Sequence, residues 1–218
     1  MKNLFLVIAF ACLANTSFAQ FSIGLTAGGN ASHLKWYLKS LDEDLGYENA
    51  LGWRAALLSE WQVSPLLALR AEIAGQLKSH KIKLESDITN HSGYLRDHYQ
   101  YWEGSLLAQV SPLKKIRQMY LLAGCTAGRL TKAWQKIDEG LVEGGSSIKR
   151  DLDLDENYFN RNAFAADFGI GGNIPLGAVS SLKIEGRYQL GLSNFSSHDN
   201  VEARNNTFIF SVGYLHRI

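Results

Sequence analysis

The stretch Leu182–Ser193, LKIEGRYQLGLS, alternates between two kinds of side chain. Its even-numbered positions hold leucine, isoleucine, glycine and tyrosine, while lysine, glutamate, arginine and glutamine hold the odd-numbered positions up to residue 189. A period of two is that of a β-strand, because successive side chains point to opposite faces; a helix would spread both sets around its circumference. A membrane-crossing strand needs about 9–11 residues, against about 5–6 in an ordinary strand. The stretch therefore predicts a membrane-spanning strand with one apolar and one charged face.

The same alternation recurs on both sides of this stretch and predicts about eight strands in all. The fifth of them alternates less cleanly, with its apolar side formed by Leu121, Ala123, Cys125 and Ala127. Besides residues 182–193, the predicted strands lie near residues 21–28, 51–62, 67–78, 101–110, 119–130, 164–174 and 208–214.

The connections between these strands are of two kinds. Pro65, Pro112 and Pro175 fall at every second connection, and those connections are short; Gln62–Leu66, QVSPL, even recurs as Gln109–Leu113. Proline cannot donate to a strand ladder, so its confinement to turns favours an uninterrupted sheet. Short turns on one side and long loops on the other are typical of outer-membrane barrels, with the turns and termini in the periplasm. The other four connections are longer and polar and span about residues 33–49, 85–97, 134–160 and 196–205.

These patterns predict an all-β fold: a transmembrane antiparallel up-and-down β-barrel of about eight strands, with short periplasmic turns and long extracellular loops. An even number of strands closes the sheet and removes its edges, as a lipid environment requires. The alternative is a soluble periplasmic ligand-binding barrel, whose interior would be apolar. The long strands favour placing the aliphatic side chains outward, in the membrane.

The first nineteen residues have the pattern of a secretory signal peptide. Lys2 supplies the positive charge, Leu4–Leu13 a short apolar core, and Ser17–Ala19 a small-x-small cleavage site. We therefore expect a signal peptide over residues 1–19 and one outer-membrane barrel domain over residues 20–218. Cys125 is then the only cysteine left, which excludes an intramolecular disulfide and predicts a buried, inert thiol.

The charge of the chain argues against nucleic acid as a partner. Lysine and arginine number 22 against 21 aspartates and glutamates, and the only basic cluster is the short Lys114–Arg117. The expected partners are outer-membrane lipid and lipopolysaccharide, together with a protein partner bound through the extracellular loops. We expect a monomer.

Five motifs carry a resemblance to a known family. They read FSIGLTAGGN, LRAEI, YLLAG, DFGIG and EGRYQLGL, and they resemble the small outer-membrane β-barrel family of Bacteroidetes, whose members are described as porin-like or PorT-like. The resemblance runs strand by strand and implies an eight-stranded outer-membrane barrel, but it implies no activity. The chain departs from the pattern at its end, YLHRI, which lacks a terminal aromatic residue. The motifs occupy residues 21–30, 69–73, 120–124, 167–171 and 185–192.

The inward face of the predicted strands carries charges of both signs. An eight-stranded barrel is narrow enough to be filled by its own side chains, and unpaired charge in its lumen would be costly. The mixture therefore predicts a structural ion network that plugs the lumen; the alternative is a narrow porin-like channel for ions or small solutes. Arginine partners would hold the carboxylates ionised, which disfavours catalysis there. The predicted network comprises Arg54, Glu60, Arg70, Glu72, Glu103, Asp167, Lys183, Glu185 and Arg187.

The histidines and one acidic segment are candidate metal sites. The histidine spacings match no ligand signature, and 151–156, DLDLDE, lacks the glycine and final glutamate of an EF-hand. We expect no metal, no cofactor and no catalytic residue, although a looser cation contact that bridges to lipopolysaccharide phosphates stays open. Histidines on the predicted extracellular side are His33, His80, His91, His98 and His198.

An enzyme at the outer rim was the remaining alternative. Ser79 and His80 are adjacent in sequence and so point to opposite faces of a strand, and His98 is the other candidate. The chain is therefore expected not to be an enzyme. Of the aromatic residues, Trp53 and Trp102 are candidates for the membrane-interface girdle, while the loop residues Trp36, Tyr37 and Trp134 are candidates for contact with a partner.

Overall fold

The computed structural model describes residues 20–38, 43–46, 48–86, 91–112, 118–137, 147–154, 159–197 and 200–218. The predicted signal peptide over residues 1–19 lies outside these ranges, as does the basic cluster Lys114–Arg117. The part of the chain described holds no helix long and apolar enough to span a bilayer. Its strands are β1 (Gln20–Leu38), β2 (Glu43–Gly46), β3 (Glu48–Gln62), β4 (Leu67–Ser86), β5 (His91–Val110), β6 (Met119–Ile137), β7 (Ile148–Asp151), β8 (Asn162–Pro175), β9 (Ser180–Gly191) and β10 (Val201–Arg217).

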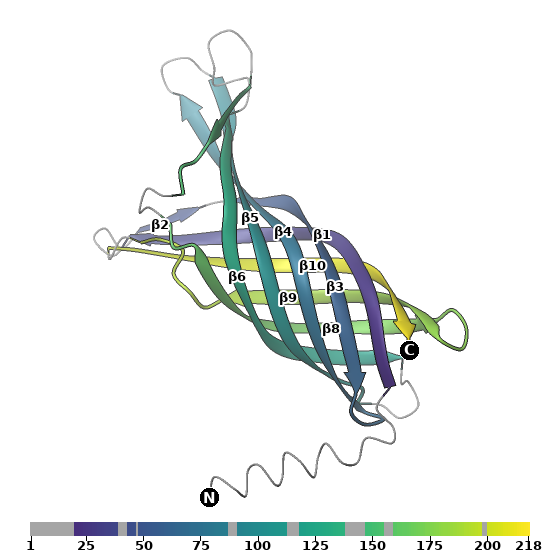
Figure 1. Ribbon diagram of the computed structural model, residues 1–218. Helices are drawn as coiled ribbons and strands as arrows, with labels where there is room; N and C mark the ends of the chain where they lie inside the picture. The colour runs from purple at the N-terminus through teal and green to yellow at the C-terminus, as the bar shows by residue number, and fades with distance from the viewer. Residues whose placement is uncertain are drawn as a thin grey trace, which may run out of the picture.

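The eight long strands form one closed ring. Each pairs antiparallel with the next long strand along the chain, in the order β1, β3, β4, β5, β6, β8, β9, β10. The ring closes because β10 also pairs with β1, from Ser22 opposite Arg217 to Leu38 opposite Val201 (Figure 1). The short strands β2 and β7 add to β1 and β6 at one end. The predicted up-and-down barrel is confirmed.

The two faces of the barrel differ as the alternation predicts. Leu57, Leu106 and Phe168 point outward and are 61%, 66% and 52% exposed, whereas their polar neighbours along the strands point inward and are buried. A soluble barrel would bury its apolar face, so the soluble ligand-binding alternative is wrong. A closed barrel with an apolar exterior satisfies its backbone internally and places that exterior in lipid. The protein folds as a transmembrane β-barrel.

One tight approach inside the barrel depends on a glycine. Tyr120 on β6 lies directly opposite Gly171 on β8, and its ring lies where a Cβ at position 171 would be. Only a residue without a side chain leaves this space, so Gly171 allows the Tyr120 ring to fill the lumen.

The prolines lie at the short turns at one end of the barrel, as predicted. Pro65 and Pro112 lie between strands, and Pro175 is the last residue of β8. Gly177, in the turn that follows, has φ +149°, a value that L side chains rarely adopt. Gln20 lies opposite Gln62, so the strand that begins the described chain starts at this same end.

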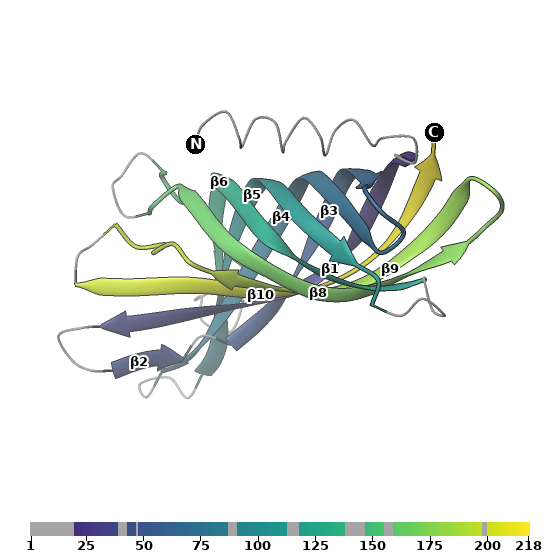
Figure 2. The same ribbon diagram turned by 90° about the horizontal axis from the view of Figure 1, so that it is seen from below.

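The described parts of the predicted long loops are largely strands, which corrects the prediction. β1 continues to Leu38, β4 and β5 stay paired as far as Ser86 opposite His91, and β10 begins at Val201. Beyond the membrane both faces of a strand meet water, so the alternation disappears although the backbone ladder continues. We call β4 from Leu77 to Ser86, with the paired parts of β5, β6 and β7, the extension. Figures 1 and 2 show it bending away from β1, β9 and β10 at this end of the barrel.

Candidate functional site

All nine side chains of the predicted lumen network point into the barrel. Each is at most 5% exposed. They come from opposite walls: Arg54 and Glu60 from β3, Arg70 and Glu72 from β4, Glu103 from β5, Asp167 from β8, and Lys183, Glu185 and Arg187 from β9.

The centre of the network alternates arginine and glutamate. Arg187 donates to both oxygens of Glu72, at 2.9 and 2.8 Å, and Glu72 also accepts from Arg54 at 2.9 Å and from Arg70 at 3.3 Å. Glu185 accepts from Arg70 at 2.6 Å and from Arg187 at 2.7 Å. Two carboxylates are thus held by three guanidinium groups, a geometry that satisfies many of their hydrogen-bonding atoms without water.

Towards the turns the network continues through a lysine and a tyrosine. Lys183 Nζ lies 2.9 Å from Glu60 Oε2, and the Tyr120 hydroxyl donates to Glu185 at 2.8 Å. Lys183 and Arg70 lie over the Tyr120 ring, at 4.5 and 5.4 Å from its centroid. Sequence reasoning missed Tyr120 because β6 has leucine on both faces, with Leu121 exposed and Leu122 buried.

Towards the opposite end the network ends in two further clusters. Lys78 Nζ lies 3.0 Å from Glu103 Oε1 and donates to Gln189 at 2.7 Å. Thr126 donates to Asp167 at 2.6 Å, and Arg187 Nη1 lies 4.0 Å from the other oxygen of Asp167. Lys78 is buried in the lumen but is absent from the predicted network.

With Lys78 included, the charges balance. The network then holds five buried cations and five buried carboxylates, so the network as a whole is neutral. Neutrality and mutual hydrogen bonding reduce the cost of removing these groups from water. The cations are Arg54, Arg70, Lys78, Lys183 and Arg187, and the carboxylates are Glu60, Glu72, Glu103, Asp167 and Glu185.

An apolar cluster covers the network at the end away from the turns; we call it the outer cluster. Its rings are Tyr99, Phe159 and Phe195, with centroids 4.9 to 6.0 Å apart. Phe159 lies just before β8 and Phe195 just after β9, and the bridge between Phe159 and Ser196 joins the two segments. Phe159 was predicted to lie in a loop, and the cluster itself was not predicted. Its other members are Leu34, Tyr101, Leu130, Ala133 and Ala203, with Leu152, Leu154 and Ala163 packed against them.

The turn end of the lumen is open. A cavity of about 350 Å³ lies there, and Glu60 and Gln109 line it together with the more peripheral Gln62 and Ser111. A second cavity of about 20 Å³, beside Lys78 under the outer cluster, is large enough for a water molecule at most. The wide part of the lumen therefore ends at the charge network.

The histidines do not form a metal site in the described part of the chain. His33 contacts Asn49 at 3.1 Å, and the buried His80 contacts Asn205 at 3.2 Å. No group of three histidine, cysteine, aspartate or glutamate side chains could hold a metal ion among the residues described. His198, Asp155 and Glu156 lie outside those residues, and so does the side chain of His91.

Ser79 and His98 form a pair that sequence reasoning missed. They lie opposite each other on β4 and β5, with Ser79 Oγ 2.8 Å from His98 Nδ1. His80 does point to the other face, as expected, but the cross-strand register was needed to find His98. Ser79 is fully buried, and Asp97 faces away and accepts from Gln135 at 3.0 Å. The pair thus presents no accessible nucleophile.

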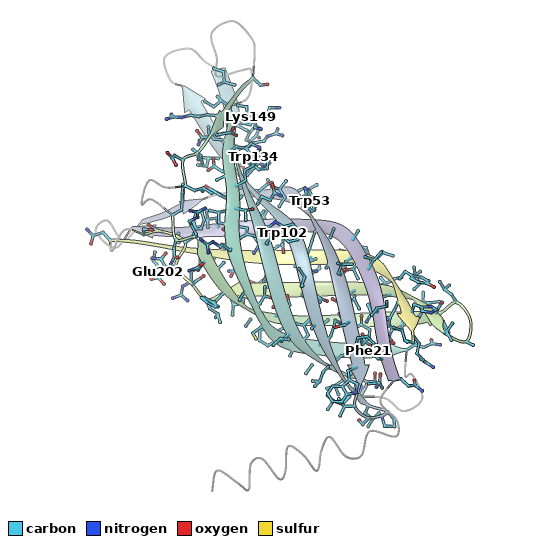
Figure 3. The ribbon with its side chains drawn as sticks, in the orientation of Figure 1. Phe21, Trp53, Trp102, Trp134, Lys149 and Glu202 are labelled. Carbon is cyan, nitrogen blue, oxygen red and sulfur yellow. The ribbon has the colours of Figure 1, made fainter. Side chains whose placement is uncertain are left out.

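The aromatic girdle and the free thiol are both on the outer face. Trp53 and Trp102 are exposed there, at the base of the extension (Figure 3). Trp134 lies on β6 rather than in a loop, stacked on His98 with centroids 5.2 Å apart. The side chains of Trp36 and Tyr37 lie outside the described residues. Cys125 is exposed rather than buried, because the apolar face of a barrel is its exterior.

No protein-family model and no curated protein matches the sequence. Among solved structures, the chain is similar to Ail, the attachment invasion locus protein of Yersinia pestis, in complex with the heparin analogue sucrose octasulfate. The identity is 14% over 90% of this chain and 99% of that chain, with a TM-score of 0.43. The outer membrane protein OprG from Pseudomonas aeruginosa is 10% identical over 92% of this chain and 97% of that one, with a TM-score of 0.48. The outer membrane protease OmpT from Escherichia coli is 8% identical over 91% and 97%, with a TM-score of 0.44. These likenesses concern the fold alone.

Proposed function

We propose that this protein is an integral outer-membrane barrel that does not conduct ions and that acts through its extracellular surface, in a structural or interaction role. The observation that carries the proposal is the double closure of the lumen. The neutral charge network fills the middle of the barrel, and the outer cluster covers it.

An ion that crossed the network would have to separate groups that are already paired. Glu72 alone contacts three guanidinium groups within 3.3 Å. Opening that contact leaves buried charges without partners, and breaking one buried pair by removing a partner costs about 3–5 kcal/mol. Beyond it, an ion would have to pass the packed side chains of the outer cluster, most of whose atoms are carbon and cannot replace the water that the ion loses.

The experiment is an ion-flux assay on liposomes that contain the folded protein and a trapped fluorescent chloride indicator. Proof of folding is a gel-mobility difference between boiled and unboiled samples, because a closed barrel resists SDS until it is heated. We expect the heat-dependent shift together with a flux equal to that of protein-free liposomes. Flux above that background, in a sample that shows the shift, would overturn the proposal.

A narrow porin-like channel is the second candidate, and the open cavity of about 350 Å³ at the turn end favours it. In a channel, that cavity would be the part of the ion pathway at the turn end of the lumen, and the charge network would be the gate that closes it. The same flux assay decides between the two, because a channel of this kind conducts in the wild-type protein.

We further propose, from the sequence, that the protein belongs to a Bacteroidetes barrel family and that it is exported by a cleaved signal peptide. The five strand motifs support membership of the Bacteroidetes family of porin-like or PorT-like barrels, and the apolar core Leu4–Leu13 before Ala19 supports cleavage of a signal peptide. Terminal sequencing of the protein purified from outer membranes tests the second point. A mature chain that starts at Gln20 is the expected result.

A further inference from the structure

The cavity of about 350 Å³ at the turn end of the lumen is filled neither by the charge network nor by the outer cluster. Its volume falls within the range of small-molecule sites, about 300–1,000 Å³. The cavity opens at the turns, which lie at the end of the barrel opposite the extension (Figure 1), and the charge network bounds it on the inner side. With the predicted topology, the opening faces the periplasm.

The walls of the cavity are rich in amide and hydroxyl groups. More than half of its described lining residues carry one of the two, among them Gln62, Gln118 and Asn173. Ser22 on β1 and Ser111 after β5 also line it, and each is 9% exposed. The described part of the chain provides no hydrogen bond to the Oγ atom of either serine. Polar groups that are partly withdrawn from water in this way favour a ligand that both donates and accepts hydrogen bonds.

The floor of the cavity is polar but presents no unpaired charge. Glu60 lies there beside Gln109, which donates to Glu60 Oε1 at 3.4 Å. The other oxygen, Glu60 Oε2, lies 2.9 Å from Lys183 Nζ and 3.4 Å from Arg70 Nε. A carboxylate that is neutralised by cations still accepts hydrogen bonds from a neutral ligand. A ligand with a net charge would find no unpaired opposite charge on this floor.

Carbon surface lies among these polar groups. Leu215 on β10 points inward and is 7% exposed, and Pro65 and Pro175 line the cavity near the turns. Arg217, the other charged residue of the described lining, is exposed. Small-molecule sites combine apolar walls with oriented polar groups. A sugar ring fits this combination, because it has C–H faces and carries hydroxyl groups that each donate and accept.

We propose that the turn-end cavity binds a neutral saccharide of mono- or disaccharide size, either a free sugar or the end of a cell-wall glycan. An ion would find no unpaired charge on the floor, and an apolar molecule would leave the hydroxyl groups of Ser22 and Ser111 without partners. The inference does not depend on whether the lumen conducts, because the ligand enters and leaves through the same opening.

The experiment is a saturation-transfer NMR titration of the full-length mature protein in micelles of a zwitterionic detergent, since detergents with sugar head groups would compete. The neutral ligands are maltose and N,N′-diacetylchitobiose. The charged comparators are lactobionate, an anionic disaccharide, and chitobiose, the cationic deacetylated form. Every sample is first checked for the heat-dependent gel shift, so that failure of the barrel and failure of the site are distinguished.

Two variants alter the cavity from opposite walls. Ser111→Phe places a ring inside it, and Ser22→Ala removes one hydroxyl group without changing the volume appreciably. The matched controls are Ser59→Phe and Ser59→Ala, because Ser59 lies opposite Ile23 on the outer face of β3, outside the cavity lining. Ser22→Ala keeps the test decisive if Ser111→Phe does not fold.

We expect the wild type and both controls to bind a neutral disaccharide more tightly than either charged comparator. Ser111→Phe should lose this binding, and Ser22→Ala should bind about two- to tenfold more weakly, the effect of roughly one hydrogen bond. Preference for N,N′-diacetylchitobiose would identify cell-wall glycan as the source, and preference for maltose would identify a free sugar.

Three results would overturn the proposal. The first is the absence of saturation transfer to both neutral disaccharides in the folded wild type. The second is equal binding by the cavity variants and their Ser59 controls, which would place the sugar elsewhere on the protein or micelle. The third is tighter binding of lactobionate or chitobiose than of the neutral disaccharides, which would mean that an unpaired charge such as that of Arg217 selects the ligand.

Discussion

Arg187 and Glu72 face each other across the lumen as a bidentate ion pair, with donor–acceptor distances of 2.9 and 2.8 Å between residues 115 positions apart in the chain. Both side chains are almost completely buried. The pair ties β9 to the opposite wall, β4, which is not its neighbour in the sheet. The barrel is therefore cross-braced through its interior as well as closed around its circumference.

Replacing Glu72 by glutamine is expected to destabilise the barrel strongly. The change leaves Arg187, Arg54 and Arg70 with one carboxylate partner fewer, and removal of one member of a buried charged cluster costs about 3–5 kcal/mol. Urea unfolding in detergent or lipid vesicles measures the free energy of unfolding. Glu48→Gln is the control, because the ion pair of Glu48 with Lys81 is exposed and such pairs are worth about 0–1 kcal/mol. Equal stability of the two variants would contradict the bracing role of the network.

Gly171→Ala should destabilise the barrel through Tyr120. The added Cβ would overlap the Tyr120 ring, which is held between two cations and Glu185, and overpacking of this kind costs about 1–3 kcal/mol. Gly104→Ala is the matched control, since a Cβ there meets no atom within 4 Å. Unfolding curves of the two alanine variants should separate clearly. If they coincide, the Tyr120 ring does not fill the lumen as described.

Cys125 provides a direct report on the outer face. A nitroxide attached to it in vesicles should be relaxed by oxygen, which concentrates in lipid, far more than by a water-soluble nickel complex, because Cys125 is exposed among lipid-facing side chains. A nitroxide at Lys136→Cys, in a protein with Cys125→Ser, should show the opposite preference, because Lys136 is exposed on the extension. Preference for the nickel complex at Cys125 would mean that the faces of the barrel are reversed.

The stability of the extension should depend on pH through His98. Burial and the nearby Arg96, Lys136 and Lys149 lower the pKa of His98 in the folded state below its unfolded value near 6.5, so the unfolded chain binds more protons as pH falls through that value. The sign is therefore a loss of local stability on acidification. Amide hydrogen exchange of β5 and β6 should be faster at about pH 5.5 than at about pH 7.5 after correction for the intrinsic rate.

His98→Asn is the control for this pH effect, because asparagine does not titrate in this range. Asp97, on the opposite face of β5, has its pKa raised by burial, so its contribution has the opposite sign and remains in the variant. The acceleration on acidification should disappear in His98→Asn. An acceleration of equal size in the variant would exclude His98 as its source.

Much of the barrel could be predicted from side-chain alternation because the membrane imposes it. Inside the hydrocarbon layer one face must be apolar, so Leu57, Leu106 and Phe168 identify the exterior. The nine lumen charges that were predicted follow from the opposite phase. β6 was the exception, because its inward Leu122 packs with Tyr120 and breaks the polar pattern.

The extension could not be predicted in the same way. Outside the membrane no rule separates the two faces, so strands such as β4 from Lys81 onward look like polar loops. The relationships that matter there are between strands: Ser79 with His98, and Lys81 with Arg96, depend on a register that sequence periodicity does not specify. The outer cluster was missed for a related reason, since Phe159 and Phe195 lie in irregular segments that only the folded chain brings together.

The most direct test of the sealed lumen is single-channel recording of the wild-type protein in a planar bilayer, with insertion verified by the heat-dependent gel shift of the same preparation. The charge network and the outer cluster predict a flat current, without discrete steps, across the range of applied voltage. Reproducible unitary steps that are carried by small ions would contradict the account, because they would require a continuous water path past Arg187 and Glu72.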